Sequence, residues 1–231
     1  MSGVSQPVLL DLFCGAGGCT RGYQERGFEV VGVDIEPMPN YCGETFIQMD
    51  ALLFLARLVG GETVAGWRLQ DFSAAHASPP CPVHSSLNGW SGETTSPDLV
   101  PSTRLWLEKT GLPYVIENVP GAPLVNPVQI CGQALGLKVR RHRLFETNFP
   151  VMVPPCHHPE PPVIVVGGSI GRKVFDPRRK AKAPSFEEAK EVMEMPWVQK
   201  RQEVANAVPP AYTRLIGEQL QIHLAARKAA A

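Results

Sequence analysis

The sequence predicts an α/β fold with a doubly wound, mostly parallel sheet and a small loop-rich lobe. Apolar runs of strand length alternate with helical patterns through the first two thirds of the chain, as in parallel sheets with crossover helices. Polar side chains follow several of these runs, at the edge where such sheets bind their ligands. The alternation then stops, and nine prolines lie between Glu146 and Gln202.

Apolar runs and their breaks predict the individual elements. Strands are expected at residues 8–13, 28–34, 47–50, 72–78 and 114–117, and helices from about 18, over 39–46, from about 51 and over 101–109. A further strand is expected at 162–166. Ser185 and Glu188 have capping-box spacing, which predicts a helix from 186 to about 195. A last helix at 211–227 is expected to pack on the main core.

Length and composition predict one globular core. The 231 residues are 44% hydrophobic, which suffices for a substantial core with a small appendage. There is no charged-then-apolar leader and no apolar run of membrane-spanning length. The six cysteines lack paired CxxC spacing, which fits a reducing compartment. We therefore expect a monomeric cytoplasmic protein that does not associate with membranes.

A glycine-rich turn follows the first expected strand. The segment Asp11 to Gly22 reads DLFCGAGGCTRG, and Gly15, Gly17 and Gly18 leave the backbone bare just before a helix. A nucleotide-like ligand can lie against such a turn. Asp34 ends the second strand, where its carboxylate can accept both hydroxyls of a ribose. The alternative interpretation is that the glycines serve only close helix packing.

Cys81 and Glu117 are candidate reactive groups. Cys81 lies in the turn Ser78-Pro79-Pro80-Cys81-Pro82, which three prolines make rigid. A thiolate held in this way is a covalent nucleophile if a nearby helix or cation lowers its pKa, although a buried structural cysteine is the commoner case. Glu117 ends the strand at 114–117, at the same predicted edge. The two side chains are therefore placed to address one ring.

A net charge of zero conceals two halves of opposite sign. Residues 1–130 contain 6 Lys and Arg against 13 Asp and Glu, whereas residues 131–231 contain 16 against 9. A one-sided excess of cations favours a polyanionic partner, although a solvated surface has the same composition. The cations gather in two groups, the first being Arg140, Arg141 and Arg143 and the second Arg172, Lys173, Arg178, Arg179, Lys180 and Lys182.

Five motifs resemble those of the cytosine-5 DNA methyltransferase family in their order and approximate spacing. They are the segment 11–22, Pro80-Cys81, Glu117-Asn118-Val119, Arg141-His142-Arg143 and the segment 205–210. The resemblance covers residues 8–146 and 197–224 and is greatest to small members from bacteriophages and bacteria, some of which serve restriction-modification. It implies a Rossmann-like methyltransferase fold that uses S-adenosylmethionine, in a phage or bacterial protein of the host cytoplasm.

The resemblance also implies which residues hold the methyl donor. Phe13, Gly15 and Gly17 would cradle it, and Asp34 would bind its ribose. The remaining implied contacts are Ile35 against the adenine ring, Asp50 at the adenine amino group, and Asn206 with Ala207 beside the pocket.

For the transfer itself, the resemblance implies a covalent mechanism. Cys81, placed by Pro80, would add to carbon 6 of cytosine, which makes carbon 5 electron-rich. Glu117 would contact N3 and the amino group of the base, and Arg143 would donate to O2. Arg141 would help to position the loop. Because these atoms lie inside a stacked duplex, the base must be flipped out or already single-stranded.

The short lobe suggests limited sequence recognition. Ser85 and the second group of cations are the expected nucleic-acid contacts, and cations on phosphates add affinity without sequence information. We therefore expect DNA methylation with short or relaxed specificity. An RNA cytosine-5 methyltransferase is one alternative. A catalytically silent nucleic-acid-binding paralogue is another.

The resemblance and the change in composition divide the chain into three parts. Residues 1–146 are expected to form the catalytic and cofactor-binding domain, 147–196 the reduced recognition lobe, and 197–231 a C-terminal segment that packs back on the first part. The run Cys156-His157-His158 is similar to a fragment of a metal site, but no second ligand pair stands near it in the sequence. No bound metal is therefore expected.

Overall fold

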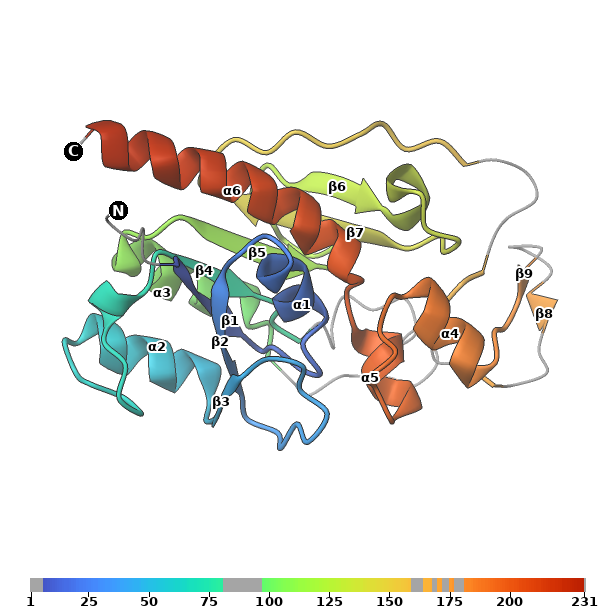
Figure 1. Ribbon diagram of the computed structural model, residues 1–231, viewed down its shortest axis with the longest axis horizontal. Helices are drawn as coiled ribbons and strands as arrows, with labels where there is room; N and C mark the ends of the chain where they lie inside the picture. Colours follow the sequence, from blue (N-terminus) through green and yellow to red (C-terminus); the bar gives the residue numbers. More distant parts are fainter. Residues whose placement is uncertain are drawn as a thin grey trace.

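A seven-stranded sheet forms the centre of the protein (Figure 1). The computed structural model describes residues 6–80, 97–158, 164–167, 170–171, 175–176 and 181–230, with the backbone alone at 175, 176, 181 and 182. The strands are β1 (Val8–Leu12), β2 (Glu29–Asp34), β3 (Thr45–Gln48), β4 (Ala74–Ala77), β5 (Tyr114–Asn118), β6 (Val128–Cys131) and β7 (His142–Thr147). Their order is β3-β2-β1-β4-β5-β7-β6, in which β7 alone runs in the opposite direction to the other strands.

Helices cover both faces of the sheet. The helices are α1 (Gly18–Gln24), α2 (Ala51–Val59), α3 (Val100–Thr110), α4 (Phe186–Val192), α5 (Arg201–Asn206) and α6 (Pro210–Ala230), with 3-10 turns η1 (Leu69–Asp71) and η3 (Gly132–Leu135). One core cluster joins β1, β2 and β5 to α1 and α6, and a second joins the other sheet face to α2 and α3. The doubly wound α/β fold expected from the sequence is confirmed. Within the described part of the chain, no helix has both the length and the apolarity of a membrane span.

The strand order places a ligand-binding edge between β1 and β4. From β1 the chain continues outward through β2 and β3, whereas β4 and β5 build the other half of the sheet. The direction of winding therefore reverses between β1 and β4, and ligands of such sheets bind beyond the carboxyl ends of the strands at this reversal.

Glycines allow α1 to lie directly against the start of α6. A Cβ atom added to Gly22 would lie 2.1 Å from Oγ1 of Thr213 and 2.2 Å from the carbonyl oxygen of Pro210. At Gly18 it would lie 2.2 Å from the carbonyl oxygen of Val208. These two glycines therefore serve close packing, which was the alternative interpretation of the glycine-rich turn.

A third, smaller core lies at the right of Figure 1, where α4 of the expected lobe packs with α5 of the C-terminal segment. It joins α4 and α5 to Val166, Ile170 and Met195. The predicted capping box is present: Glu188 N donates to Ser185 Oγ at 3.2 Å, and Ser185 N donates to Glu188 Oε2 at 2.7 Å. Two short strands, β8 (Phe175–Asp176) and β9 (Ala181–Lys182), pair antiparallel.

The expected helix at 39–46 was wrong. Residues 39 and 40 form a turn, and β3 begins at Thr45. The side chain of Tyr41 packs so closely on the sheet that a Cβ atom at Gly32 would lie 2.4 Å from its hydroxyl oxygen. Tertiary contact therefore decides the conformation of this segment.

Other expected boundaries shift by a few residues. The strand predicted at 47–50 is β3, and Asp50 instead caps α2. The helix predicted to reach residue 195 ends at Val192, and Glu194 follows with a positive φ of 57°. Of the strand predicted at 162–166, residues 162 and 163 lie outside the described residues, and Ile164 forms a parallel bridge with Val139.

We expect Gly22→Ala to destabilise the protein by about 1–3 kcal/mol, because the new methyl group would force α1 away from α6. Urea denaturation at constant pH measures the change. Gly60→Ala is the matched control, since φ is −70° there and the nearest atom to a new Cβ would be 3.3 Å away. Equal stability of the two variants would contradict the proposed close contact.

Candidate active site

The glycine turn after β1 is fixed by backbone conformation and by Asp34. Phe13, Gly15 and Gly17 all have positive φ, of 57°, 51° and 86°. The amide of Gly15 donates a hydrogen bond of 2.9 Å to Oδ2 of Asp34 at the end of β2. A Cβ atom at Gly15 would meet no other atom within 4 Å. The turn therefore leaves open space beside Gly15, in contrast to the packed Gly18.

An exposed apolar side chain follows Asp34. Oδ1 of Asp34 accepts a 3.0 Å hydrogen bond from the amide of Glu36, which fixes the start of this loop. Ile35 is 59% exposed, although it follows a buried strand. Asp50 caps α2, because its Oδ1 accepts a 2.7 Å hydrogen bond from the amide of Leu53.

The C-terminal segment closes one side of the turn. Nε1 of Trp197 donates to the carbonyl oxygen of Ala16 at 2.9 Å, and the guanidinium of Arg21 lies 5.3 Å from the centre of the Trp197 ring. Ala207 is half-buried against the small core, whereas Asn206 is exposed and its Oδ1 accepts from Gln202 at 2.8 Å. Trp197 was not predicted from the sequence as a site residue, because it belongs to none of the motifs.

These residues fit S-adenosylmethionine as a ligand. Open space beside Gly15 leaves room for a chain against the bare turn, and the Asp34 carboxylate can accept from ribose hydroxyls. The exposed face of Ile35 offers apolar contact to a flat ring. Because the Asp50 carboxylate already caps α2, any contact it makes with an adenine amino group is additional to that role.

Glu117 and Arg143 form a largely buried ion pair on neighbouring strands. Glu117 lies in β5 and Arg143 in β7, and Nε of Arg143 is 2.9 Å from Oε1 of Glu117, although the contact lacks hydrogen-bond geometry. Burial raises the pKa of Glu117, and the nearby Arg143 and Arg141 partly oppose the rise. The structure thus brings the two predicted base-contacting residues together.

Arg141 ties the lobe to the main domain. Its Nη1 donates to the carbonyl oxygen of Val166 at 3.1 Å, and its Nη2 donates to that of Ala205 at 2.8 Å. The carbonyl oxygen of Arg141 accepts from the hydroxyl of Tyr212 at 2.5 Å. Arg141, directly before β7, therefore contacts Val166, α5 and α6 at once.

The chain leading to Cys81 is anchored beside this ion pair. Nδ2 of Asn118, the residue after Glu117, donates to the carbonyl oxygen of Pro79 at 3.1 Å. Pro80 is exposed, and Cys81 lies immediately outside the described residues. Ser85 lies outside them as well, as do the side chains of the predicted cations Arg172, Lys173, Arg178, Arg179, Lys180 and Lys182.

A buried row of hydrogen-bonded side chains lies behind Glu117 and was not predicted from the sequence. The hydroxyl of Tyr23 and Nδ1 of His76 are 3.0 Å apart, and Nε2 of His76 is 3.0 Å from Oγ of Ser78. Ser78 also counteracts the rise in the pKa of Glu117. Burial lowers the pKa of His76 to about 3, so the imidazole is neutral at pH 7. The network supports Glu117 from within the core.

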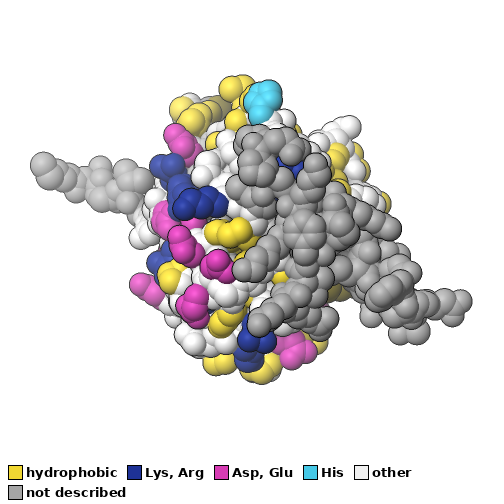
Figure 2. All heavy atoms as spheres, turned by 90° about the vertical axis from the view of Figure 1, so that its right-hand side faces the viewer, with side chains coloured by type: hydrophobic (Ala, Val, Ile, Leu, Met, Phe, Trp, Pro, Cys, Tyr) yellow, Lys and Arg dark blue, Asp and Glu magenta, His cyan; other side chains and the backbone are white. Residues whose placement is uncertain are grey.

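The described surface of the lobe carries both signs of charge. On the face shown in Figure 2, basic and acidic side chains lie next to one another. Lys190 pairs with Glu187 at 2.8 Å, and in the adjoining C-terminal segment Lys200 pairs with Glu203 at 3.6 Å. Nucleic-acid binding by the predicted cations thus stays a prediction.

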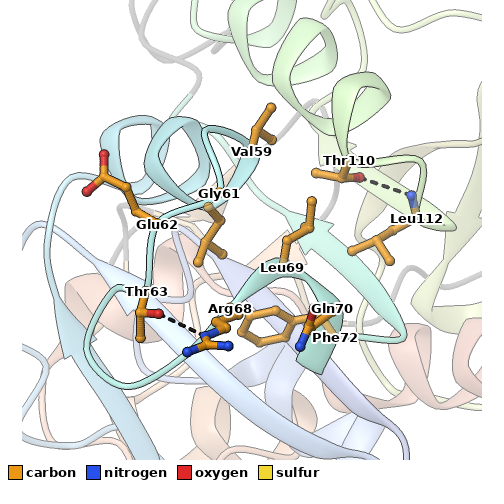
Figure 3. A pocket seen from close by; sticks show the side chains of 11 residues that line it. Val59, Gly61, Glu62, Thr63, Arg68, Leu69, Gln70, Phe72, Thr110 and Leu112 are labelled. Atoms are coloured by element: carbon orange, nitrogen blue, oxygen red, sulfur yellow. Dashed lines mark hydrogen bonds between the residues drawn. The ribbon is translucent and has the colours of Figure 1, made fainter.

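A separate hollow of about 730 Å³ lies at the opposite edge of the sheet (Figure 3). Arg68, Leu69 and Phe72, which line it, immediately precede β4, and Leu112 precedes β5. This hollow therefore lies at the amino ends of the strands and away from the Glu117–Arg143 pair.

Solved structures share this architecture. A prophage-encoded E. coli protein assigned as a DNA modification methyltransferase matches with a TM-score of 0.60 and 15% identity, over 93% of this chain and 98% of that one. The chain has a methyltransferase fold. S. pombe Dnmt2 methyltransferase matches with a TM-score of 0.56 and 12% identity, over 94% and 99% of the two chains. The Entamoeba histolytica methyltransferase EhMeth gives 0.57 and 11%, over 95% and 99%. No family model and no curated protein sequence matches the chain.

Asp11 lies under the glycine turn in a fully buried position. Its Oδ2 accepts a 2.6 Å hydrogen bond from Oγ1 of Thr20, while Oδ1 has no hydrogen-bond partner among the described residues. Burial raises the pKa of Asp11 to about 7, with a smaller contribution from Asp34. The folded protein thus keeps the Asp11 carboxyl neutral up to a higher pH than the unfolded chain does.

We expect Asp11→Asn to gain stability relative to the unaltered protein as the pH rises from about 4 to about 7. Between the pKa of Asp11 in the unfolded chain, about 4, and its pKa in the folded protein, about 7, only the folded state keeps the proton. The free energy of unfolding of the unaltered protein therefore falls as the pH rises through this range, by up to about 4 kcal/mol. Asparagine keeps an acceptor for Thr20 and does not titrate. Urea denaturation of both proteins across this range measures the difference between their free energies of unfolding. His76 titrates in both proteins, so its opposing effect on stability cancels in this difference. A constant difference would contradict the neutral carboxyl.

Proposed function

We propose that this protein transfers a methyl group from S-adenosylmethionine to carbon 5 of cytosine in DNA. One observation carries the proposal: a buried carboxyl and a guanidinium face one another at the carboxyl edge of the sheet, where the anchored Pro79 leads to Cys81. The methyltransferase fold and the open glycine turn beside this pair support it. In this proposal residues 1–146 hold both sites, 147–196 contact the nucleic acid, and 197–231 complete the main domain.

The donor would be held across β1 and β2. S-adenosylmethionine, when bound, supplies an electrophilic methyl group. Asp34 accepts from the ribose, and Ile35 packs against the adenine ring whose amino group Asp50 contacts. The turn leaves room for the rest of the molecule beside Gly15, whereas Gly17 packs against Cys42 and Tyr41 and would shape the turn. Asn206 and Ala207 would border the pocket from the C-terminal segment.

The chain's own groups activate the base. The thiolate of Cys81 forms a bond to carbon 6, and the electron pair of the 5,6 double bond becomes available at carbon 5. Burial raises the pKa of Glu117, which favours sharing of a proton between this carboxyl and N3, while Arg143 donates to O2, and both stabilise the charge that develops on the ring. After methylation, a base removes the proton from carbon 5, the double bond re-forms and the thiolate leaves.

The cations of the C-terminal half support a nucleic-acid substrate. A cytosine within a duplex must leave the stack before Cys81 can reach carbon 6. Since the lobe is short and rich in prolines, few side chains are available to read base edges, and we propose short or relaxed sequence specificity.

Asp34→Ala should weaken S-adenosylmethionine binding by about 1.5–3 kcal/mol, because charge-assisted hydrogen bonds to the ribose are lost. Isothermal titration calorimetry measures the affinity. Glu62→Ala, which alters an exposed carboxylate at the opposite edge of the sheet, is the control and should bind normally. Unchanged affinity of the Asp34 variant, with a normal fold by circular dichroism, would place the donor elsewhere.

Cys81→Ala should abolish methyl transfer to DNA while retaining donor binding, and Glu117→Gln should slow transfer by at least about 100-fold. Incorporation of label from tritiated S-adenosylmethionine into cytosine-containing DNA measures the rate, and DNA with every cytosine already 5-methylated should accept none. Glu108→Gln, on the outer helix α3, is the control for Glu117.

A 5-fluorocytosine oligonucleotide gives an independent readout of the covalent step. Fluorine cannot leave carbon 5 as a proton does, so Cys81 should remain attached to the base in a complex stable to denaturation. Labelling of RNA but not DNA would favour the RNA methyltransferase. Donor or nucleic-acid binding with no transfer to either would favour the silent paralogue, and full activity of Cys81→Ala would overturn the covalent mechanism.

A further inference from the structure

Two cysteines and two histidines converge where β6 ends and β7 begins, on the sheet face opposite to the Glu117–Arg143 pair. Cys131 ends β6 and lies opposite His142, the first residue of β7, in the strand register. Cys156 and His158 belong to the segment that follows β7 and returns past α6, as seen along the top of Figure 1. One atom from each of the four side chains lies within 4.8 Å of the others.

The four atoms are as close as the ligands of one metal ion. The shortest separations are 2.8 Å from Cys156 Sγ to His158 Nε2 and 3.1 Å between the two Nε2 atoms. His142 Nε2 is 3.3 Å from Cys156 Sγ, and Cys131 Sγ is 3.5 Å from His158 Nε2. A tetrahedral zinc site places two nitrogens about 3.3 Å apart, a nitrogen and a sulfur about 3.6 Å apart and two sulfurs about 3.8 Å apart.

A bound cation also explains why these atoms face one another. All four carry lone pairs, and the two imidazole nitrogens can supply only one proton each to the cluster. Without a cation, the thiol and imidazole protons can pair only some of these lone pairs, and the S–H group is a weak donor. Two thiolates would balance the charge of a divalent ion, so the complete site would be neutral.

We propose that Cys131, His142, Cys156 and His158 bind a structural zinc ion. The ligand set of two thiolates and two imidazoles favours zinc among the common divalent metals, and four protein ligands leave no open position for catalysis. Sequence analysis expected no metal because Cys156 and His158 have no second pair near them in the chain. The second pair is Cys131 and His142, which the pairing of β6 with β7 brings close to Cys156 and His158.

The ion would act as a clamp between the segment leading to the lobe and the strand that bears Arg143. Arg143 follows His142 directly, and its Nη1 donates to the carbonyl oxygen of His142 at 3.0 Å. Successive side chains of a strand point to opposite faces, so the metal would hold β7 from the face opposite to the Glu117 ion pair. The start of the lobe is thereby fixed relative to the candidate active site.

Metal analysis of the full-length protein, expressed with zinc and purified without chelators, should find about one zinc per chain. Cys156→Ala and His158→Ala, both at surface positions, should lose this zinc, whereas His157→Ala should keep it. His158→Cys should keep it also, because a third thiolate can replace the imidazole. Removal of the metal by a chelator should lower the melting temperature of the unaltered protein and of His158→Cys, and leave that of Cys156→Ala unchanged.

Cobalt(II) provides a readout that needs neither activity nor zinc. Reduced, metal-free protein titrated with Co²⁺ should develop the visible bands of a tetrahedral site and a thiolate charge-transfer band. Absence of both zinc and these bands in the unaltered protein would overturn the proposal. So would equal loss of metal in His157→Ala, or a Cys131–Cys156 disulfide in freshly isolated protein together with no cobalt uptake after reduction.

Discussion

The contact between α1 and α6 is the constraint on which the candidate site depends. Without a Cβ at Gly22, the start of α6 lies on α1, and the segment before α6 is brought onto the glycine turn. Trp197 then reaches Ala16, and the carbonyl oxygen of Val208, which follows α5, lies against Gly18. Residues nearly two hundred positions apart are brought together because α1 has no side chain at Gly22, where it meets Thr213 of α6.

The strand ends were predictable from the sequence because apolar runs and polar ends follow local rules. The positions of Asp34 and Glu117 at one edge required only the alternation of strands and helices. The conformation of residues 39–46 was not predictable in this way, since Tyr41 takes its position from contacts with glycines of other elements. His76 and Trp197 belong to none of the motifs, so their places beside the candidate site were likewise found only from the structure.

The Cys131 cluster shows a different limit of sequence analysis. Its residues are joined by the pairing of β6 with β7 and by the return of the chain past α6, and neither leaves a regular spacing. The same strand serves two purposes, because His142 and Arg143 point to opposite faces. The reversed strand β7, between β5 and the edge strand β6, thus connects the candidate active site to the segment that leads to the lobe.

The turn after β1 has a further consequence for how a ligand would associate. Phe13 has a positive φ, which is unfavourable for a residue with a side chain and costs about 1 kcal/mol or more. The hydrogen bond from Gly15 to Asp34 holds this conformation before any ligand arrives. The conformational entropy of the turn is therefore lost when the chain folds, and association with a ligand proceeds on a rigid template.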